Sequence, residues 1–298
     1  MSPVVGLLHE IQLIANSQVV VFANPDFDLT AAKMSAQIDP SSSSLGPSAL
    51  RGNEQRDLTE YSFSPLKGTQ KESDALTRKF KEWDCQVVNF TGDQATKQAL
   101  LKEVHSPYIL HIATHGFFDR QSSPSQSAPN ALFSLAQPNV GTSKFFKNPM
   151  HRSGLALAGA QTTIEAWKRD EVPPVENDGI LTAEDVSTLD LQGTWLVTLS
   201  ACDTGSGEAR AGEGVMGLRR GFIQAGAQNL LMTLWPISDE VTVQIMSDFY
   251  DAAHNSGDAP EALAEVQRNW LLKLRTEKGL AQAVNLAGPF IMSSQGKP

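Results

Sequence analysis

The sequence has few cysteines and no long apolar run. Its two cysteines, Cys85 and Cys202, lie far apart and outside any C-x-x-C spacing, which argues against a disulfide framework and against a zinc knuckle. No apolar segment approaches the roughly 18 residues of a membrane span. The N-terminal stretch also lacks the basic start and the cleavage pattern of a signal peptide. We therefore expect a cytoplasmic protein that does not enter a membrane.

Positive charge is also scarce. The 298 residues include 24 Lys and Arg against 33 Asp and Glu, which gives a formal net charge of −9. This balance repels phosphate backbones, and no run of about five or six basic residues overrides it, so we do not expect a nucleic-acid partner. Apolar residues make up 41% of the chain, which is enough at this length to bury a sizeable core.

Short runs rich in Val, Ile and Leu recur and are typical of strands buried on both faces of a sheet. They span residues 19–23, 86–90, 108–113, 195–200 and 229–235. The segments between them place apolar residues on one helical face, at 71–83, 215–225, 238–253 and 259–275. Ser238 is the expected N-cap of the third helix, and Pro260 lies in the first turn of the fourth. This alternation predicts an α/β fold with a mainly parallel sheet and helices on both faces.

Three polar stretches interrupt the pattern. Residues 39–57 and 119–153 are rich in Ser, Pro, Asn and Gln, and residues 169–178 are acidic. Because such composition offers little apolar surface to bury, we expect mobile loops in all three places. We assign residues 19–298 to one domain and residues 1–18 to an N-terminal segment or the remnant of an upstream region.

His115 is the first candidate catalytic residue. It follows the apolar run 108–113 and precedes Gly116, which would permit a tight turn. In an open parallel sheet, ligands bind beyond the carboxyl ends of the strands, where a catalytic base would stand. A loop histidine bonded to a backbone carbonyl is the alternative. His111 lies four residues earlier, about 13 Å away along a strand, which is too far to share a metal ion. We interpret His111 as a buried core residue and expect no metal site.

Cys202 is the second candidate, because it follows the apolar run 195–200 and should lie at the same edge of the sheet as His115. A neighbouring imidazole can make such a thiol a nucleophile. Cys85 precedes a strand with no polar cluster nearby and is interpreted as a small apolar residue. The glycine-rich segment 205–210 departs from a dinucleotide fingerprint at Arg210, so a loop bordering a substrate cleft explains it better, and we expect no cofactor.

Six segments occur in an order that resembles CHAT domains, which are similar to caspases and separases. The resemblance extends from about Val19 to the C-terminus. The segments are "LHIATHGFF" (110–118), "SGLALAGA" (153–160), "DGILTAEDV" (178–186), "LSACDTGSGE" (199–208), "GEGVMGLRRGFIQAGA" (212–227) and "LMTLWPISDE" (231–240).

The resemblance implies a caspase-like fold and a cysteine peptidase whose catalytic dyad is His115 and Cys202. By analogy, the backbone N–H groups of Gly116 and Cys202 would bind the oxyanion. No third catalytic side chain is evident, and a carbonyl could orient the imidazole. The chain departs from the caspase signature Q-A-C-[RQG]-G, which is replaced by S-A-C-D-T-G. The insertion 119–153 also lengthens the distance in sequence from His115 to Cys202.

Substrate preference is suggested by the segment "LWPISDE", which resembles the separase segment in which an acidic residue lines the first substrate pocket. The matching residue, Asp239, would favour Arg or Lys before the cleaved bond. An acid in the first turn of a helix is also explained by the helix dipole alone. Asp203 is the other acidic candidate. A preference for Asp would instead require Arg210, Arg219 or Arg220, of which the last two fit better on the solvated face of their helix.

CHAT domains commonly follow tetratricopeptide or other helical sensor regions, in architectures associated with induced proteolysis in bacterial defence. The resemblance therefore implies a protein substrate and either an upstream helical sensor or a separate activator chain. It also implies that the isolated domain is latent until activated. Two alternatives stay open: a catalytically silent scaffold with the same fold, and a signalling module that binds a nucleotide at the glycine-rich loop.

Overall fold

The computed structural model describes residues 17–37, 58–118, 150, 153–174, 177–203, 211–235 and 239–296. Within these ranges it leaves out the side chains of residues 67, 118, 201–203, 211–215 and 239. Most of the polar stretches 39–57 and 119–153 lies outside the described residues. The same is true of the glycine-rich segment 205–210 and of Ser238, the expected N-cap.

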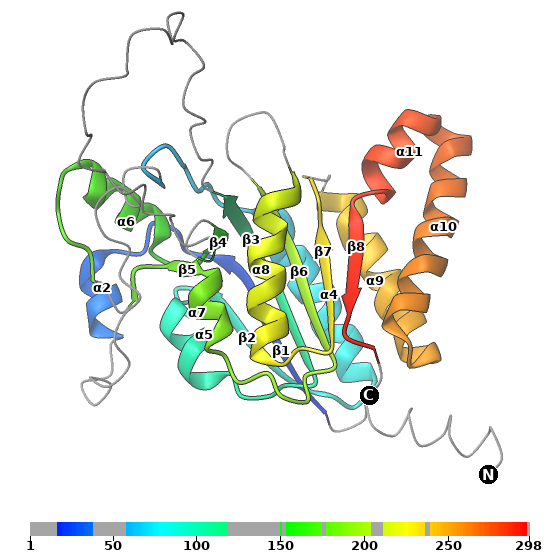
Figure 1. Ribbon diagram of the computed structural model, residues 1–298, viewed down its shortest axis with the longest axis horizontal. Helices are drawn as coiled ribbons and strands as arrows, with labels where there is room; N and C mark the ends of the chain where they lie inside the picture. Colours follow the sequence, from blue (N-terminus) through cyan, green and yellow to red (C-terminus); the bar gives the residue numbers. More distant parts are fainter. Residues whose placement is uncertain are drawn as a thin grey trace, which may run out of the picture.

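The described strands form one eight-stranded sheet, whose main path has the order β2-β1-β3-β6-β7-β8 (Figure 1). The first five strands of this path pair in parallel, and β8 is antiparallel to β7. They are β2 (Gln86–Gly92), β1 (Gln18–Pro25), β3 (Ile109–Phe118), β6 (Leu196–Asp203), β7 (Asn229–Thr233) and β8 (Phe290–Ser294). Two short antiparallel strands, β4 (Ser153–Ala156) and β5 (Ile180–Thr182), extend the sheet beside the end of β3. The predicted mainly parallel sheet is confirmed.

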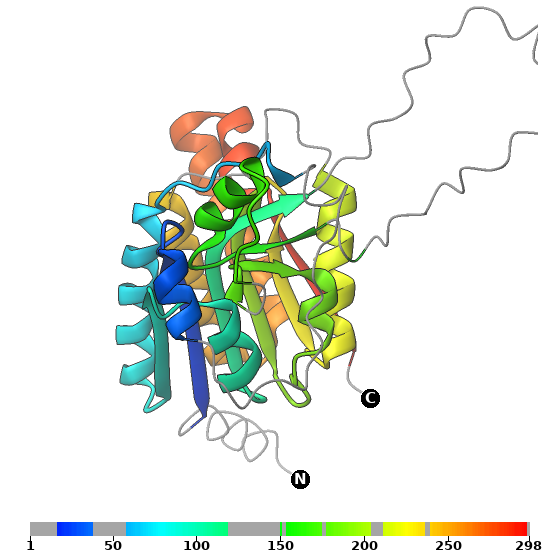
Figure 2. The same cartoon turned by 90° about the vertical axis from the view of Figure 1, so that its left-hand side faces the viewer.

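Helices cover both faces of the sheet, as Figure 2 shows. One face, here called the α4 face, packs against α4 (Lys67–Glu82), α9 (Asp239–Ser256), α10 (Ala259–Lys278) and α11 (Leu280–Ala287). The opposite face, here called the α8 face, packs against α5 (Lys97–Glu103), α7 (Ala183–Ser187) and α8 (Ala211–Ala225). Two further helices, α2 (Ala31–Ala36) and α6 (Ala160–Lys168), contribute to separate small clusters near β4.

The four predicted helices are present as α4, α8, α9 and α10. Pro260 lies in the first turn of α10, and the side chain of Asp258 caps this helix by accepting the N–H of Glu261 at 3.0 Å. Gly226 follows α8 with φ of 110°, a backbone conformation that favours glycine and ends the helix.

Alternation along the central strands divides the core between the two faces. On β3, Ile109 and Ala113 belong to the α4 face, whereas Leu110 and Ile112 belong to the α8 face. On the neighbouring β6, Leu196 belongs to the α4 face. Because successive strand residues point to opposite faces, every second residue from these positions shares a face. Both faces are covered, which explains why these strands are apolar without interruption.

One strand prediction was wrong in its burial. Residues 86–90 do form β2, but this strand is not buried on both faces, and Val88 is 38% exposed. The reason is its position, because β2 lies at the edge of the main path and pairs with β1 alone among the described strands.

The end of β3 also differs from the prediction. His115 was expected to follow the strand and Gly116 to form a tight turn, whereas both residues lie inside β3, which continues to Phe118. The cause is an additional partner: residues 115–118 pair with β4, beyond the point where the pairing of β3 with β1 ends at Ala113.

A buried charge cluster fastens β5 and α7 to α5. The Nζ of Lys97 lies 3.0 Å from Asp185 Oδ2 and 3.4 Å from Asp178 Oδ1, and it donates to the Ile180 carbonyl at 2.9 Å. Burial lowers the pKa of Lys97, but the two carboxylates outweigh it and raise that pKa overall. Burial raises the pKa of Asp178. The end of the third polar stretch is therefore buried, not solvated as expected.

Candidate active site

The two candidate catalytic residues lie opposite each other on adjacent strands. In the pairing of β3 with β6, His115 is the partner of Cys202. Neighbouring strands are about 4.8 Å apart, so the backbones of these two residues are in direct proximity. Alternation assigns both to the α4 face, because His115 is two residues beyond Ala113 and Cys202 is six residues beyond Leu196. The fold thus brings together two residues that are far apart in the sequence.

The strand β4, which pairs with the end of β3 from His115 onward, requires a glycine. Gly154 lies on β4, between β3 and β5, and pairs with Phe117 and Thr182. A Cβ at this position would lie 2.2 Å from the Leu181 carbonyl oxygen and 2.4 Å from the Phe117 ring. Since neither distance is sterically possible, β4 can pack here only with glycine, which gives a structural reason for the segment "SGLA".

The imidazole of His115 is held by a backbone carbonyl. Its Nε2 lies 2.7 Å from the Ser64 carbonyl oxygen. A carbonyl only accepts hydrogen bonds, so Nε2 carries the proton and Nδ1 is the ring atom that can take up another. The orientation required of a catalytic base is thus supplied without a third side chain.

The Ser64 carbonyl belongs to an extended segment, residues 61–66, that precedes α4 and is here called the strap. Pro65 restricts Ser64 to extended conformations and therefore limits the directions in which this carbonyl can point. Phe63, in the middle of the strap, is buried, and its backbone N–H donates to Gln161 Oε1 at 2.8 Å. The strap is thus fixed at Phe63, directly before the carbonyl that binds His115.

Aromatic side chains exclude water from His115, which is 3% exposed. The ring centroids of Phe27 and Phe63 lie 5.1 and 5.8 Å from that of the imidazole. Burial disfavours the charged imidazolium and lowers the pKa of His115, and the bond to Ser64 opposes this shift to a smaller degree. A neutral imidazole is the form that can accept a proton from a thiol.

Directly below the dyad, a buried polar network joins β3, β6, α4 and α9. Its members are His111, Glu72, Ser200, Tyr250 and Thr198. Glu72 Oε1 lies 3.2 Å from His111 Nε2, and Glu72 Oε2 accepts the Ser200 hydroxyl at 3.0 Å. His111 Nδ1 lies 3.0 Å from the Tyr250 hydroxyl, which donates to Thr198 at 2.8 Å. The interpretation of His111 as a buried, hydrogen-bonded core residue is confirmed, since it is 0% exposed.

Sequence reasoning missed Glu72, although a signal was present. Glu72 lies four and eight residues before Leu76 and Phe80, which form the apolar stripe of α4, so its carboxylate falls on the same buried face. A charge in an apolar stripe needs a buried partner. The contribution of Ser64 had no comparable signal, because any residue carries a carbonyl.

The two acidic pocket candidates lie on different faces of the sheet. Asp239 is the first residue of α9, which packs on the α4 face, as His115 does. Asp203 pairs with Gly116 and follows Cys202, so alternation assigns it to the α8 face. Of the two, only Asp239 begins an element on the side of the sheet where the dyad lies.

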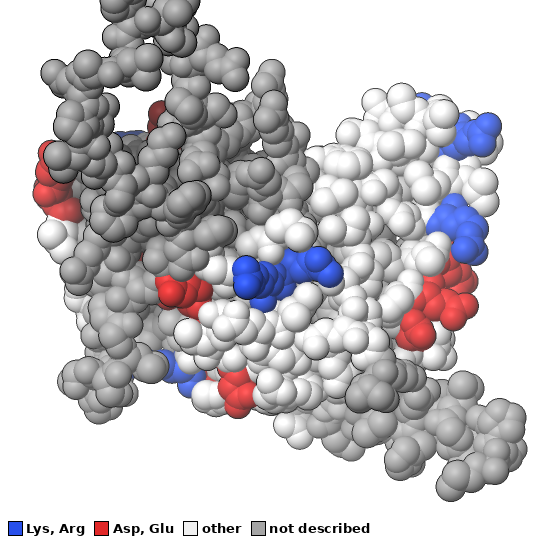
Figure 3. Space-filling view, viewed as in Figure 1, with Lys and Arg blue, Asp and Glu red and all other residues white. Residues whose placement is uncertain are grey.

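The basic candidates lie on the opposite side. Arg219 and Arg220 belong to α8, and the basic side chains at the centre of Figure 3 lie over this helix. Arg219 is half-buried and donates to the Ser293 hydroxyl of β8 at 2.7 Å, whereas Arg220 is exposed. Arg210 lies outside the described residues. A pocket for an acidic side chain next to the dyad is therefore not formed by Arg219 or Arg220.

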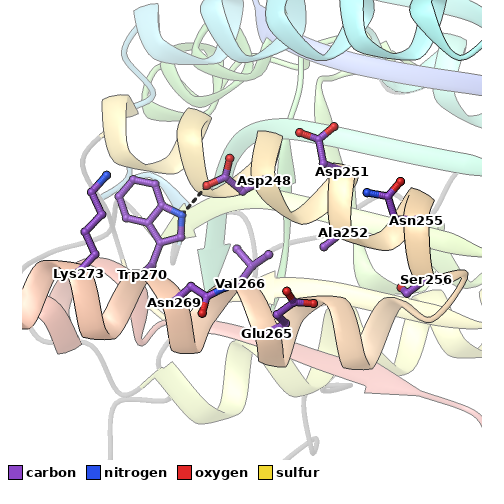
Figure 4. A pocket seen from close by; sticks show the side chains of 10 residues that line it. All are labelled: Asp248, Asp251, Ala252, Asn255, Ser256, Glu265, Val266, Asn269, Trp270 and Lys273. Carbon is purple, nitrogen blue, oxygen red and sulfur yellow. Dashed lines mark hydrogen bonds between the residues drawn. The ribbon is translucent and has the colours of Figure 1, made fainter.

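A surface pocket of about 580 Å³ opens between α9 and α10, as Figure 4 shows. Asp248 and Glu265 line it from facing helices, and Asp248 accepts the indole N–H of Trp270 at 2.8 Å. The helices that form it cover the α4 face on the side of β7 and β8. The pocket contains neither His115 nor a residue of its aromatic wall, so it is separate from the candidate active site.

The other sequence candidates are placed as follows. Cys85 is buried, as expected, and burial followed by the charge of Asp84 raises the pKa of its thiol to about 11, which keeps it protonated and unreactive. Within the described ranges, no group of three His, Cys, Asp or Glu side chains is arranged to hold a metal ion. Across the same residues, none of the helices has both the length and the apolar character needed to cross a membrane.

Comparison with known proteins gives two kinds of match. The family model of the CHAT domain matches residues 7–289. Tetratricopeptide repeat protein 28 of Homo sapiens is 25% identical over 259 residues, which are 86% of this chain and 10% of that protein. Its counterpart from Mus musculus is 27% identical over 207 residues, which are 69% of this chain and 8% of that protein. The chain thus spans about a tenth or less of the length of these relatives.

The family match covers nearly the whole chain and includes every described strand except the last. It agrees with the fold, because a mainly parallel sheet covered by helices on both faces is the caspase-like architecture that the sequence motifs implied. The chain belongs to the CHAT domain family, a family of caspase-like cysteine peptidases.

Proposed function

We propose that the protein is a regulated cysteine endopeptidase that cleaves protein substrates with a dyad of His115 and Cys202. The observation that carries the proposal is the register of β3 and β6, in which these two residues are partners on the same face. The imidazole is already oriented by the Ser64 carbonyl, and its pKa is lowered by burial, as a resting general base requires.

In the proposed mechanism, Nδ1 of His115 takes the proton from the Cys202 thiol. The resulting thiolate attacks the scissile carbonyl and forms a tetrahedral oxyanion, for which the backbone N–H groups of Gly116 and Cys202 are the proposed donors. The imidazolium then passes its proton to the leaving amine as the C–N bond breaks. Water, deprotonated by the same imidazole, finally hydrolyses the thioester and regenerates the thiol.

For the substrate we propose a basic residue before the cleaved bond, with Asp239 as the carboxylate that binds it. The support is positional, because Asp239 begins α9 on the α4 face. Asp203 is the weaker candidate because alternation assigns it to the α8 face. A carboxylate and an arginine side chain would form a charge-assisted, bidentate contact.

Regulation is proposed to come from a helical-repeat region or a separate activator chain. Both relatives are named for tetratricopeptide repeats, and they are far longer than this chain. In this proposal, residues 19–298 form the catalytic unit, residues 1–18 are an N-terminal segment or the remnant of an upstream region, and the protein acts in the cytoplasm. The alternative is a catalytically silent scaffold with the same fold.

The test combines cleavage with covalent labelling. Fluorogenic peptides that differ only in the residue before the cleaved bond are incubated with wild type, Cys202→Ala, His115→Ala, Asp239→Asn and the matched thiol control Cys85→Ala. We expect cleavage after Arg or Lys in wild type and the control, none in the two dyad variants, and a selective loss for basic peptides in Asp239→Asn.

A peptidyl chloromethyl ketone tests the dyad when no peptide is cleaved. We expect it to alkylate Cys202 in wild type and to do so much more slowly in His115→Ala, as mass spectrometry would report. Absence of cleavage together with labelling that does not depend on His115 would reject the peptidase and leave the scaffold.

A further inference from the structure

Gln161, at the start of α6, contacts both segments that enclose the imidazole of His115. Its side-chain Oε1 accepts the backbone N–H of Phe63 at 2.8 Å, and its backbone N–H donates to the Phe27 carbonyl at 2.9 Å. Phe27 and Phe63 are the two aromatic residues whose rings pack on His115. Gln161 therefore joins the strap to the backbone of Phe27.

We propose that Gln161 is a positioning residue for His115, which acts by holding the strap so that the Ser64 carbonyl fixes the imidazole. The inference rests on the proposed peptidase function but concerns a residue that touches neither the substrate nor the reacting atoms. The Gln161 contact is at Phe63, the residue directly before Ser64, whose carbonyl binds His115. Movement of the strap at Phe63 would therefore move that carbonyl and the Phe63 ring together.

The orientation of the Gln161 amide is itself fixed. Its Nε2 donates to Glu165 Oε1 at 2.9 Å, one helical turn later on α6, and Glu165 in turn accepts a bond from Lys168 at 2.8 Å. With the amide nitrogen bound to a carboxylate, the oxygen faces the strap as the acceptor for Phe63. The side chains of Glu165 and Lys168 are 45% and 40% exposed, so they can be changed without disturbing the core.

Loss of this contact has a predictable effect on His115. A released strap lets water reach the imidazole and no longer directs the Ser64 carbonyl to Nε2. Since burial is the main cause that holds the pKa of His115 down, hydration moves that pKa up towards its ordinary value. The preference for a proton on Nε2 weakens at the same time.

The charged groups around the ring do not account for such a change. The contacts of His115 within the described residues are two aromatic rings and a carbonyl. The charged side chains on the neighbouring segments are those of Asp26, Asp28, Glu60 and Lys168, which are exposed, and of Glu165, which is half-exposed. Glu72 and His111 are buried below the dyad, and by register Cys202 is adjacent.

Three variants separate positioning from general stability. Gln161→Ala removes the acceptor. Glu165→Gln is the matched control, because its amide oxygen can still accept from Gln161. The double variant Gln161→Glu with Glu165→Gln exchanges the two side chains, so that the carboxylate at 161 accepts both the Phe63 N–H and the new amide of residue 165. It should restore the wild-type geometry.

The primary readout is ¹⁵N and ¹³C NMR of the His115 ring, which needs no substrate. We expect a raised pKa and a loss of the Nε2–H tautomer in Gln161→Ala, and wild-type values in the control and the exchange variant. Unchanged tautomer and pKa in a folded Gln161→Ala would overturn the inference, whether or not the protein is a peptidase.

Kinetics supply the second readout once a cleaved peptide is known. We expect kcat/KM of Gln161→Ala to fall by about tenfold to a hundredfold, with the acid limb of its pH profile moved to higher pH. If Gln161 served only the stability of the fold, Gln161→Ala would lower the amount of folded protein without moving the acid limb of the pH profile. A protein that cleaves nothing and whose labelling at Cys202 does not depend on His115, but that shows the NMR changes, would refute the peptidase proposal and leave the positioning role of Gln161 standing.

Discussion

Glu72 offers the sharpest test of the buried network below the dyad. Its carboxylate is the shared partner of two groups on different strands, the buried imidazole of His111 on β3 and the half-buried hydroxyl of Ser200 on β6. Glu72→Ala removes that partner and leaves Nε2 of His111 without one in a site from which water is excluded, since His111 is 0% and Glu72 2% exposed. We therefore expect this variant to be strongly destabilised.

The protons shared in the network around His111 show why Glu72→Ala and Glu72→Gln should differ. The Tyr250 hydroxyl gives its proton to Thr198, so its oxygen accepts from His111, and the Nδ1 of that ring carries a proton. Nε2 of His111 then faces Glu72 Oε1 at 3.2 Å, the distance of an ion pair, although the alignment is poorer than that of a hydrogen bond. Two lone pairs would repel at this distance, so one proton lies between these atoms.

A glutamine at position 72 also places one proton toward Nε2 of His111 and one acceptor toward Ser200. Its amide N–H donates to Nε2 of a neutral His111, and its oxygen accepts the Ser200 hydroxyl. We expect Glu72→Gln to lose less than about 1 kcal/mol. For Glu72→Ala, the unsatisfied buried Nε2 of His111 costs about 1–3 kcal/mol and the half-buried Ser200 hydroxyl adds less, which gives a loss of about 2–4 kcal/mol.

The assay is equilibrium unfolding in urea at neutral pH, monitored by far-ultraviolet circular dichroism. Glu82→Ala, at an exposed position of the same helix, is the control, and we expect it to stay within about 0.5 kcal/mol of wild type. The reasoning is refuted if Glu72→Ala loses less than about 1 kcal/mol, or if Glu72→Gln loses as much as Glu72→Ala.

Three other expectations follow from the same contacts. Gly154→Ala should unfold at lower urea concentration than wild type, because the added methyl would lie 2.2 Å from a backbone carbonyl of the next strand. Phe63→Ala should raise the pKa of His115, measured by NMR titration, since it removes part of the burial that lowers that pKa. Lys97→Met should cost about 3–5 kcal/mol at pH 8, because it leaves two buried carboxylates without a cation. Burial holds the pKa of Asp178 above its unfolded value, so protonation of this carboxyl favours folding. The loss of unfolding free energy in Lys97→Met should therefore be smaller at pH 5 than at pH 8.

The central strands were predictable because their environment is uniform. A strand covered on both faces must be apolar throughout, and the runs that became β1, β3, β6 and β7 satisfy this condition. The same reasoning misjudged the edge strand β2, because an apolar run does not reveal how many neighbours a strand has. It also missed β4, β5 and β8, which have only three to five residues each. Such lengths carry too little periodicity to be recognised.

For the site, the catalytic residue types could be predicted from the sequence, but their surroundings could not. His115 and Cys202 could each be assigned to the carboxyl edge of a sheet, whereas their pairing depends on the register of β3 with β6. The contact of the Ser64 carbonyl with His115 depends on how the strap folds back, and no side chain in the sequence indicates that path. Glu72 could have been found, because a carboxylate in the apolar stripe of a helix requires a buried partner.

The contacts of α4 and the strap indicate where a change of activity can arise. The strand register of the dyad is fixed by continuous pairing from Ile109 to Gly116, which a local movement outside the sheet would not alter. The strap and α4, however, contact the base of the dyad and the strand of its nucleophile: Ser64 binds His115, and Glu72 binds Ser200, which precedes Cys202 by two residues on β6. A shift of this one segment against the sheet would therefore disturb the base and the strand of the nucleophile together, while the fold itself stays intact.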